Sequence, residues 1–229
     1  MKSETIIRVV MVLVTLCGLS GCGKKPKAPA RAESVTTCLA TLTDPAGFAR
    51  VPAGKAGMLS TYDRTGGNRD WFEFPEISRD GRVLVADLKG PGIVRRIWQT
   101  SIPEAYRWRF FFDGEERPRL TVLGAELFGQ TAVLPYPLCG SVGGGAYSYL
   151  PLPYARSLRI EVEPRPKVEA GFRFFHVGYE TCAPDVRVES YPPDPEGRVA
   201  EDMKKTASAW NGMAGAASFS SATFPCASV

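Results

Sequence analysis

The sequence predicts an all-β fold, an antiparallel sandwich, on three observations. From about residue 55 to residue 182 the chain consists of short runs rich in β-branched and aromatic residues, broken by Gly, Pro and Asp, without a long stretch of helical periodicity. Leu158, Ile160 and Val162 alternate with charged residues, which is typical of a strand with one buried and one solvated face. The Asp-Gly pair at 113–114 follows an aromatic run and is a strong signal for the tight turn that joins antiparallel strands.

The strands are expected where these runs occur, at residues 82–87, 94–100, 108–112, 119–123, 157–163 and 172–180. The Gly-Pro-Gly sequence of residues 90–92 separates the first two, because neither glycine nor proline favours a continued strand. Three consecutive glycines at 143–145 predict a loop. The side chains of Trp98, Trp108 and the phenylalanines at 110–112 are expected in the core of the sandwich.

The sandwich is expected to occupy residues 51–183, and residues 184–229 are expected to form a Pro-rich connection, a short helix and an irregular tail. The helix is placed at residues 201–210. The segment after it contains mainly Ala, Ser and Gly without alternation, which favours an irregular tail or the end of a shifted reading frame. A brief helical turn is expected at 126–129.

Residues 1–21 have the layout of a bacterial lipoprotein signal peptide. Basic residues flank the start of an apolar run that is too short to span a bilayer, and small residues precede Cys22. Cys22 is therefore the expected site of lipid attachment, and residues 22–50 are expected to form a lipid-anchored linker and lead-in. Because a multi-acylated N-terminus binds a bilayer strongly, we expect the protein in the bacterial cell envelope, on a membrane facing the periplasm or the exterior.

The composition limits the classes of partner. A net charge of +4 is modest, and part of it lies in the signal and linker, so no nucleic-acid partner is predicted. With one histidine and no C-x-x-C pair, neither a metal site nor a cofactor is predicted. Of the six cysteines, Cys17 lies in the signal and Cys22 carries the lipid. The remaining four allow three disulfide connectivities, among which the sequence does not choose: Cys38, Cys139, Cys182 and Cys226.

The most informative motif is residues 60–71 (STYDRTGGNRDW), where carboxylates, guanidinium groups, an amide and two amphipathic rings surround a Gly-Gly turn. Glycine permits positive φ, so the side chains on either side of the turn are expected to converge. Hydrogen-bond acceptors beside flat rings suit a sugar. The predicted substrate-binding residues are Tyr62, Asp63, Arg64, Gly67, Asn68, Asp70 and Trp71. The alternative, a surface turn with internal ion pairs, fits the composition equally well.

Five motifs together resemble a family first catalogued as domain of unknown function 2961, some members of which form glycoside hydrolase family 172. They occur in order along most of the predicted sandwich, at residues 59–68 (LSTYDRTGGN), 86–98 (ADLKGPGIVRRIW), 111–115 (FFDGE), 148–154 (SYLPLPY) and 177–180 (VGYE). The resemblance implies successive jelly-roll sandwiches, of which this chain is expected to contain the first, ending where the second should begin. It also implies homo-oligomers and activity on furanosides such as fructofuranosides or D-arabinofuranosides.

The family's catalytic glutamates belong to its second sandwich, so no catalytic residue is assigned here and the isolated chain is expected to be inactive. Asp63 and Asp70 are expected to anchor arginines or bind hydroxyls rather than to act as a catalytic carboxylate pair, for which sequence spacing gives no support. Glu180 is expected to pair with an arginine such as Arg95 or Arg96, and His176 to be a hydrogen-bonded sheet residue. The alternative function is a non-catalytic carbohydrate-binding or assembly lipoprotein.

Overall fold

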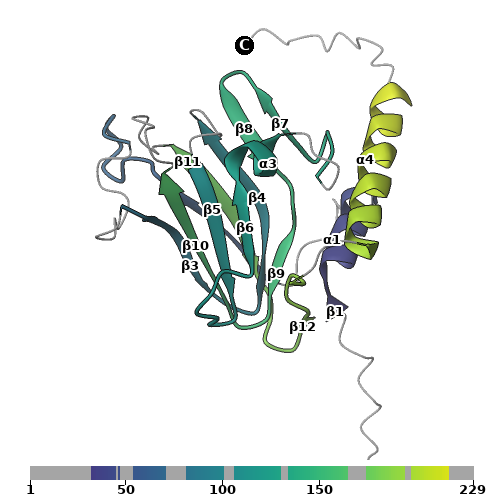
Figure 1. Cartoon of the computed structure of the whole chain (residues 1–229), viewed down its shortest axis with the longest axis horizontal. Coiled ribbons are helices and arrows are strands. Elements are labelled where there is room, and N and C mark those ends of the chain that lie inside the picture. Colours follow the sequence, from purple (N-terminus) through teal and green to yellow (C-terminus); the bar gives the residue numbers. More distant parts are fainter. Residues whose placement is uncertain are drawn as a thin grey trace, which may run out of the picture.

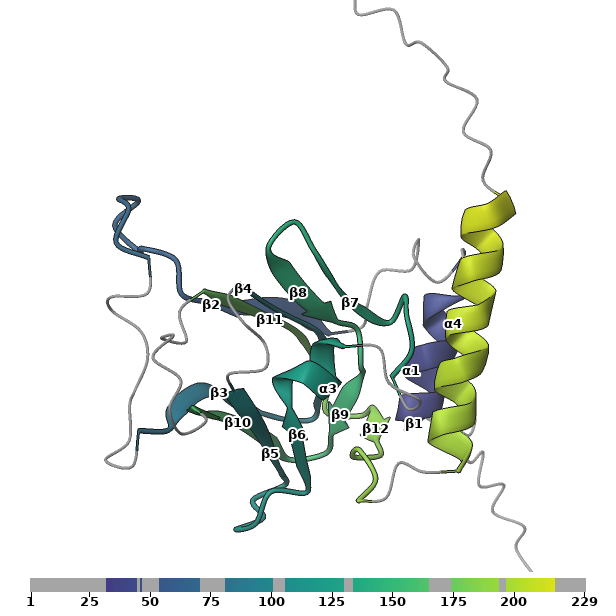
Figure 2. The same cartoon turned by 45° about the horizontal axis from the view of Figure 1, so that its top comes forward.

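Two β-sheets lie face to face in a computed structural model of the chain and enclose one hydrophobic core (Figures 1 and 2). The structure describes residues 32–44, 46, 54–70, 81–100, 106–129, 134–164, 174–193 and 197–216. The predicted antiparallel β-sandwich is confirmed, because every strand pair within the two main sheets is antiparallel.

The smaller sheet has four strands in the spatial order β3-β10-β5-β6. Their bounds are β3 Val83–Lys89, β5 Tyr106–Phe112, β6 Leu120–Leu123 and β10 Ser157–Pro164. On β10, Leu158, Ile160 and Val162 all face the core, as their alternation predicts, and they lie opposite aromatic residues of β5. Burying each of these aliphatic side chains contributes about 1.5–3 kcal/mol, so this pair of strands is a main source of stability.

The larger sheet has the order β2-β11-β4-β8-β7, and β9 pairs with the first part of β4. Its strands are β2 Lys55–Ser60, β4 Gly92–Thr100, β7 Cys139–Val142, β8 Gly145–Ser148, β9 Leu152–Tyr154 and β11 Phe175–Thr181. The register between β11 and β4 shifts where Gly178 pairs with Arg96 and Tyr179 pairs with Val94, so that Arg95 is an extra, bulged residue. The bulge changes which residues of β4 face outward.

Two helices lie side by side along one edge of the sandwich (Figures 1 and 2). They are α1, Val35–Leu42, and α4, Arg198–Ala216, and a hydrogen bond of 2.7 Å from Thr36 Oγ1 to Asp202 Oδ2 links them. Ser34 caps α1, since its hydroxyl accepts from the backbone N–H of Thr37. The short parallel strands β1, Ala32–Glu33, and β12, Arg187–Val188, attach the start of α1 to the segment before α4, and α3, Gly124–Phe128, follows β6.

Several connections differ from the sequence prediction. The glycines at 143–145 do not form an open loop: Gly143 and Gly144 form the positive-φ turn of the β7–β8 hairpin, and Gly145 begins β8. Helix α4 is longer than the predicted 201–210, and α1 was not foreseen within residues 22–50. The signal segment and Cys22 lie outside the described residues.

Three chain crossings between the sheets occur at the same end of the sandwich. There β2, β4 and β10 end, and β3, β5 and β11 begin, because each neighbouring pair is antiparallel. Residues 61–70 follow β2 at this end and extend beyond the sheets, on the side away from α1 and α4 (Figure 2). The fold therefore separates the predicted sugar-binding loop from the two helices.

Candidate functional site

The loop at residues 61–70 is organised by the carboxylate of Asp63. Its Oδ1 accepts from the backbone N–H and the hydroxyl of Thr65, at 2.9 and 2.7 Å, and its Oδ2 accepts from the backbone N–H of Arg69 at 3.0 Å. The hydrogen bonds from the Thr65 hydroxyl and backbone, followed by that from Arg69, hold the pKa of Asp63 below its usual value. Asp63 is buried within its own turn and is ionised at neutral pH.

A second carboxylate closes the loop at its base. Asp70 Oδ1 accepts from the backbone N–H of Asp63 at 2.6 Å, while the N–H of Gly66 donates to the carbonyl of Asp63 at 3.2 Å. Gly66 has φ of +78°, and a Cβ on Gly67 would lie 2.7 Å from Asp63 Oδ2. Both glycines are therefore needed for this compact turn, one for its backbone conformation and one for space.

The side chains of Tyr62 and Arg64 lie against each other on the outside of the loop. The guanidinium carbon of Arg64 is 3.8 Å from the ring centroid of Tyr62, and Nη2 donates to the carbonyl of Ser60 at 2.9 Å. A second hydrogen bond joins Arg64 to the carbonyl of Tyr62. These contacts fix the ring and the guanidinium as a unit, although 56% of Tyr62 is exposed.

The structure thus divides the predicted substrate-binding residues into two groups. The carboxylates of Asp63 and Asp70 converge on backbone N–H groups of the loop itself. The remaining described members are exposed to solvent: Tyr62, Arg64, Gly67 and Asn68. Trp71 lies outside the described residues. Binding of a sugar by these residues remains a prediction. It now depends on the exposed members, because their side chains can reach a ligand.

The outer face of the larger sheet continues from this loop and was missed by sequence reasoning. Ser60, at the end of β2, lies opposite His176 of β11, and His176 lies opposite Trp98 of β4. The rings of Trp98 and His176 have centroids 4.8 Å apart. The expectation that Trp98 is a core residue is wrong: it is half-buried on the outer face, because the bulge at Arg95 shifts the alternation along β4.

Other acidic residues are engaged in structural contacts. Glu180 forms an ion pair of 2.9 Å with Arg95, as the sequence predicted. Glu115, after the β5 turn, pairs with Arg119. In the described part of the chain no group of three or more His, Cys, Asp or Glu side chains is arranged to hold a metal ion. We assign no catalytic carboxylate among the described residues.

The three described cysteines are buried thiols. Cys38 and Cys182 share a small apolar cluster with Ile93 and Val188 between α1 and the larger sheet, whereas Cys139 lies in the main core. Burial raises the pKa of each of the three to about 11. Within the described ranges, no helix is both long and apolar enough to cross a membrane.

The fold is an antiparallel β-sandwich, and a polar, hydrogen-bonded loop lies at the end where the chain crosses between the sheets. These features place the protein in the class of β-sandwich proteins, but a fold alone does not define an activity. The model of the GH172 first beta-sandwich domain matches residues 52–198, more than half of the 229-residue chain. The chain therefore belongs to the glycoside hydrolase family 172, and the matched segment is its first β-sandwich. A comparison with curated proteins found no match.

Proposed function

We propose that this chain is a membrane-tethered lipoprotein whose first sandwich binds furanosides, of the fructofuranoside or D-arabinofuranoside type, through the exposed side of the loop at residues 61–70. Family membership supports a carbohydrate ligand. The observation that carries the proposal is the arrangement of Tyr62 and Arg64, a fixed ring and guanidinium at the surface of a loop stabilised by Asp63 and Asp70.

The fixed loop reduces the entropic cost of binding. Asp63 and Asp70 satisfy the backbone before any ligand arrives, so the exposed groups need not be ordered by the ligand. Tyr62 presents an apolar ring for a sugar face, and Asn68 presents both donors and an acceptor for hydroxyls. In this proposal the two aspartates position the loop, and the exposed residues touch the sugar.

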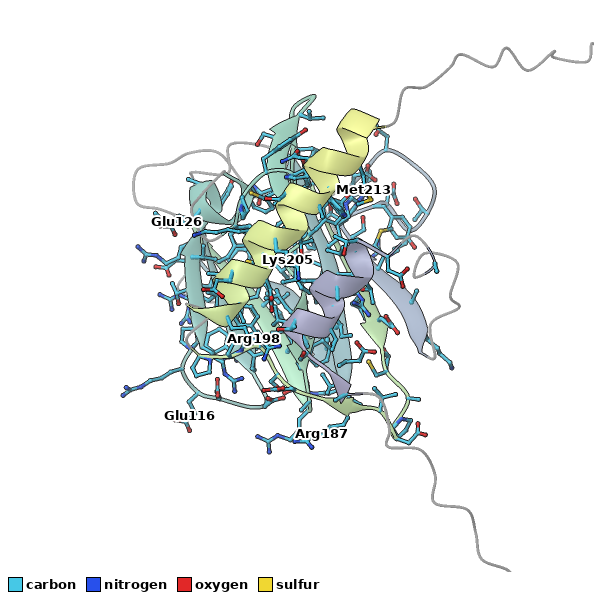
Figure 3. The ribbon with its side chains drawn as sticks, turned by 90° about the vertical axis from the view of Figure 1, so that its right-hand side faces the viewer. Glu116, Glu126, Arg187, Arg198, Lys205 and Met213 are labelled. Atoms are coloured by element: carbon cyan, nitrogen blue, oxygen red, sulfur yellow. The ribbon has the colours of Figure 1, made fainter. Side chains whose placement is uncertain are left out.

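Calorimetric titration of residues 23–229 with fructan and arabinan oligosaccharides tests the proposal. We expect binding that is lost on changing Tyr62→Ala and weakened about tenfold by Arg64→Ala, because the ring loses its fixed partner. Arg187→Ala is the matched control, an exposed arginine that projects from the molecule in Figure 3; it belongs to β12, which lies on the side of α1 and α4, away from the loop (Figure 2). Equal affinities of the wild type, Tyr62→Ala and Arg187→Ala would show that the loop does not bind the sugar.

Two further measurements address the chemistry and the tether. Release of sugar from aryl furanosides by the same protein is expected to be absent, since the carboxylates of Asp63, Asp70 and Glu180 are engaged in structural contacts. Turnover abolished by Asp63→Asn would contradict this.

The membrane tether is tested separately. Cys22→Ser in the full chain is expected to move the protein from the membrane fraction to the soluble fraction, because it removes the sulfur atom to which the lipid would be attached.

A further inference from the structure

A row of directly opposite residues crosses five strands of the larger sheet on its outer face. The register places these residues in line from β2 to β7: Ser60, His176, Trp98, Tyr147 and Gly140. We call the three ring-bearing members, His176, Trp98 and Tyr147, the aromatic strip. All three are half-buried, so one part of each ring contacts the protein and another part is open to solvent.

Glycines on the neighbouring strands let two of these rings lie across the sheet. A Cβ on Gly145 would be 2.6–3.2 Å from three atoms of the Trp98 indole, and a Cβ on Gly140 would be 2.8–3.2 Å from three atoms of the Tyr147 ring. Any larger residue at either glycine would push the ring outward. The glycines therefore keep the rings of Trp98 and Tyr147 low against the strands, and the Tyr147 ring also contacts that of Tyr149, at 5.4 Å between centroids.

The strip also has polar groups at its edges. Arg96 lies beside it on β4, opposite Gly178, and its buried Nε has no hydrogen-bond partner in the part of the chain that the structure describes. Burial, followed by the charge of Arg96, lowers the pKa of His176, so this imidazole is neutral at pH 7 and offers one donor and one acceptor. Rings with hydrogen-bonding edges, beside a guanidinium whose Nε is free to donate within the described part of the chain, match a ligand that is apolar on its face and hydroxylated at its rim.

The strip is continuous with the loop at residues 61–70. Arg64 donates to the carbonyl of Ser60, the first member of the row, and Tyr62 follows two residues later. A ligand held by Tyr62 can therefore extend over His176 and Trp98. Neighbouring strands are about 4.8 Å apart, so the strip adds a path of about 10 Å from His176 to Tyr147.

We propose that the aromatic strip is a stacking subsite for a furanoside oligosaccharide, extending the loop site across the outer face of the larger sheet. This rests on the proposed function. The row is one residue wide, whereas a stable protein interface needs about 800 Å² from each partner. The strip therefore favours a saccharide chain over a second protein, although Met58 and Val142 are exposed on the same face.

The test is calorimetric titration of residues 23–229 with a length series of fructan and arabinan oligosaccharides. We expect Trp98→Ala and Tyr147→Ala to weaken binding of the longer oligosaccharides about tenfold, because each removes a stacking surface, and to leave the shortest ligands nearly unaffected. Trp98→Phe should retain most of the affinity. Val142→Ala is the matched control, since this side chain is 77% exposed on the same face but lies outside the strip. Near-ultraviolet circular dichroism and thermal melting verify that each variant is folded.

The possible outcomes distinguish failure of the aromatic strip as a subsite from failure of the loop as a binding site. If Tyr62→Ala abolishes binding while Trp98→Ala and Tyr147→Ala bind every length as the wild type does, the strip is not a subsite and the loop function stands. If the strip variants alone lose affinity, the strip is upheld and the loop function fails. Absence of binding to any oligosaccharide, or self-association by sedimentation that Trp98→Ala abolishes, would overturn the proposal.

Discussion

Asp113 is expected to be one of the most sensitive positions for stability, because its carboxylate joins three parts of the chain. It occupies the turn after β5 with φ of 55°, and its side chain is only 13% exposed. Its Oδ1 accepts from the backbone N–H of Arg156 at 2.7 Å, and its Oδ2 accepts from the hydroxyl of Ser190 at 2.5 Å. It thereby fixes the β9–β10 turn and the segment before α4 against the β5–β6 turn.

The change Asp113→Ala removes both acceptors and places alanine in the left-handed region. Each lost hydrogen bond costs about 1 kcal/mol and the backbone conformation costs alanine about 1 kcal/mol more, so the free energy of unfolding should fall by about 3 kcal/mol. For a domain of this size the melting temperature should fall by about 6–12 °C. Asp113→Asn keeps one carbonyl acceptor and tolerates the left-handed conformation, so it should lose only about 1 kcal/mol.

Urea unfolding followed by circular dichroism measures these differences at pH 7. Asp87→Ala is the control, an aspartate whose side chain is 52% exposed and which forms a 3.6 Å ion pair with the exposed Lys89. It should change stability by less than about 0.5 kcal/mol. Equal stability of Asp113→Ala and Asp87→Ala would refute the assignment of Asp113 as a structural junction.

The same residue predicts a pH dependence. Burial opposes ionisation of Asp113, but the hydrogen bonds from Ser190 and from the backbone of Arg156 and Ser157 outweigh it and lower its pKa. A depressed pKa in the folded state means that the carboxylate stabilises the protein above its unfolded pKa, about 3.9, and that this contribution disappears as the pH falls through the folded pKa. The difference between wild type and Asp113→Asn should therefore shrink below about pH 4.

Three other predictions follow from buried contacts. Burial raises the pKa of Cys38 and Cys182 to about 11, so only about one thiol in a thousand is ionised at pH 8. Mass spectrometry should therefore show slow labelling of both thiols by iodoacetamide until denaturant is added. Rapid labelling of the native protein would contradict their burial. Asp63→Asn should lower the protection factor of the Arg69 amide against hydrogen exchange. Acidification through the lowered pKa of Asp63 should lower the wild-type protection factor too, with each rate compared to the intrinsic rate at that pH; an unchanged protection factor would refute its role in the loop. Trp210→Ala should increase proteolysis of α4, since its indole N–H donates to α1; cleavage at the wild-type rate would count against that anchor.

Strands with local alternation could be predicted from the sequence, whereas elements defined by their partners could not. The prediction for residues 157–163 agrees closely with β10, Ser157–Pro164, because alternation is a local property. The bulge at Arg95 is set by pairing with β11, and it places Trp98 on the outer face of the larger sheet while its neighbour Ile97 faces the core. Helix α1 is capped by Ser34, but its two turns are too short for periodicity to distinguish them from a linker.

For the candidate loop, too, the local sequence predicts the backbone turn but not the partners of its side chains. The Gly-Gly turn and its flanking polar groups could be recognised from composition, but the partners of those groups could not. Asp63 and Asp70 were expected to anchor arginines or to bind hydroxyls. In the structure both accept from backbone N–H groups of the loop, and Asp63 also accepts from the Thr65 hydroxyl. Short-range backbone donors compete with a ligand for the same acceptors, and only the folded geometry decides between them.

Glycines that lie under aromatic rings in the larger sheet have two different roles: one makes room for a ring inside the core, and two others lie under rings on the outer surface. Gly92, beneath the ring of the buried Tyr154, is explained by the core alone, because that ring must fit between the sheets. Gly140 and Gly145 lie under rings on the outer face, where no second layer of described strands demands room. A β-branched residue at either position would favour the strand and shield the backbone. Since these glycines do not improve the core, the property that they preserve is the low position of the rings above them, which the proposed stacking subsite would use.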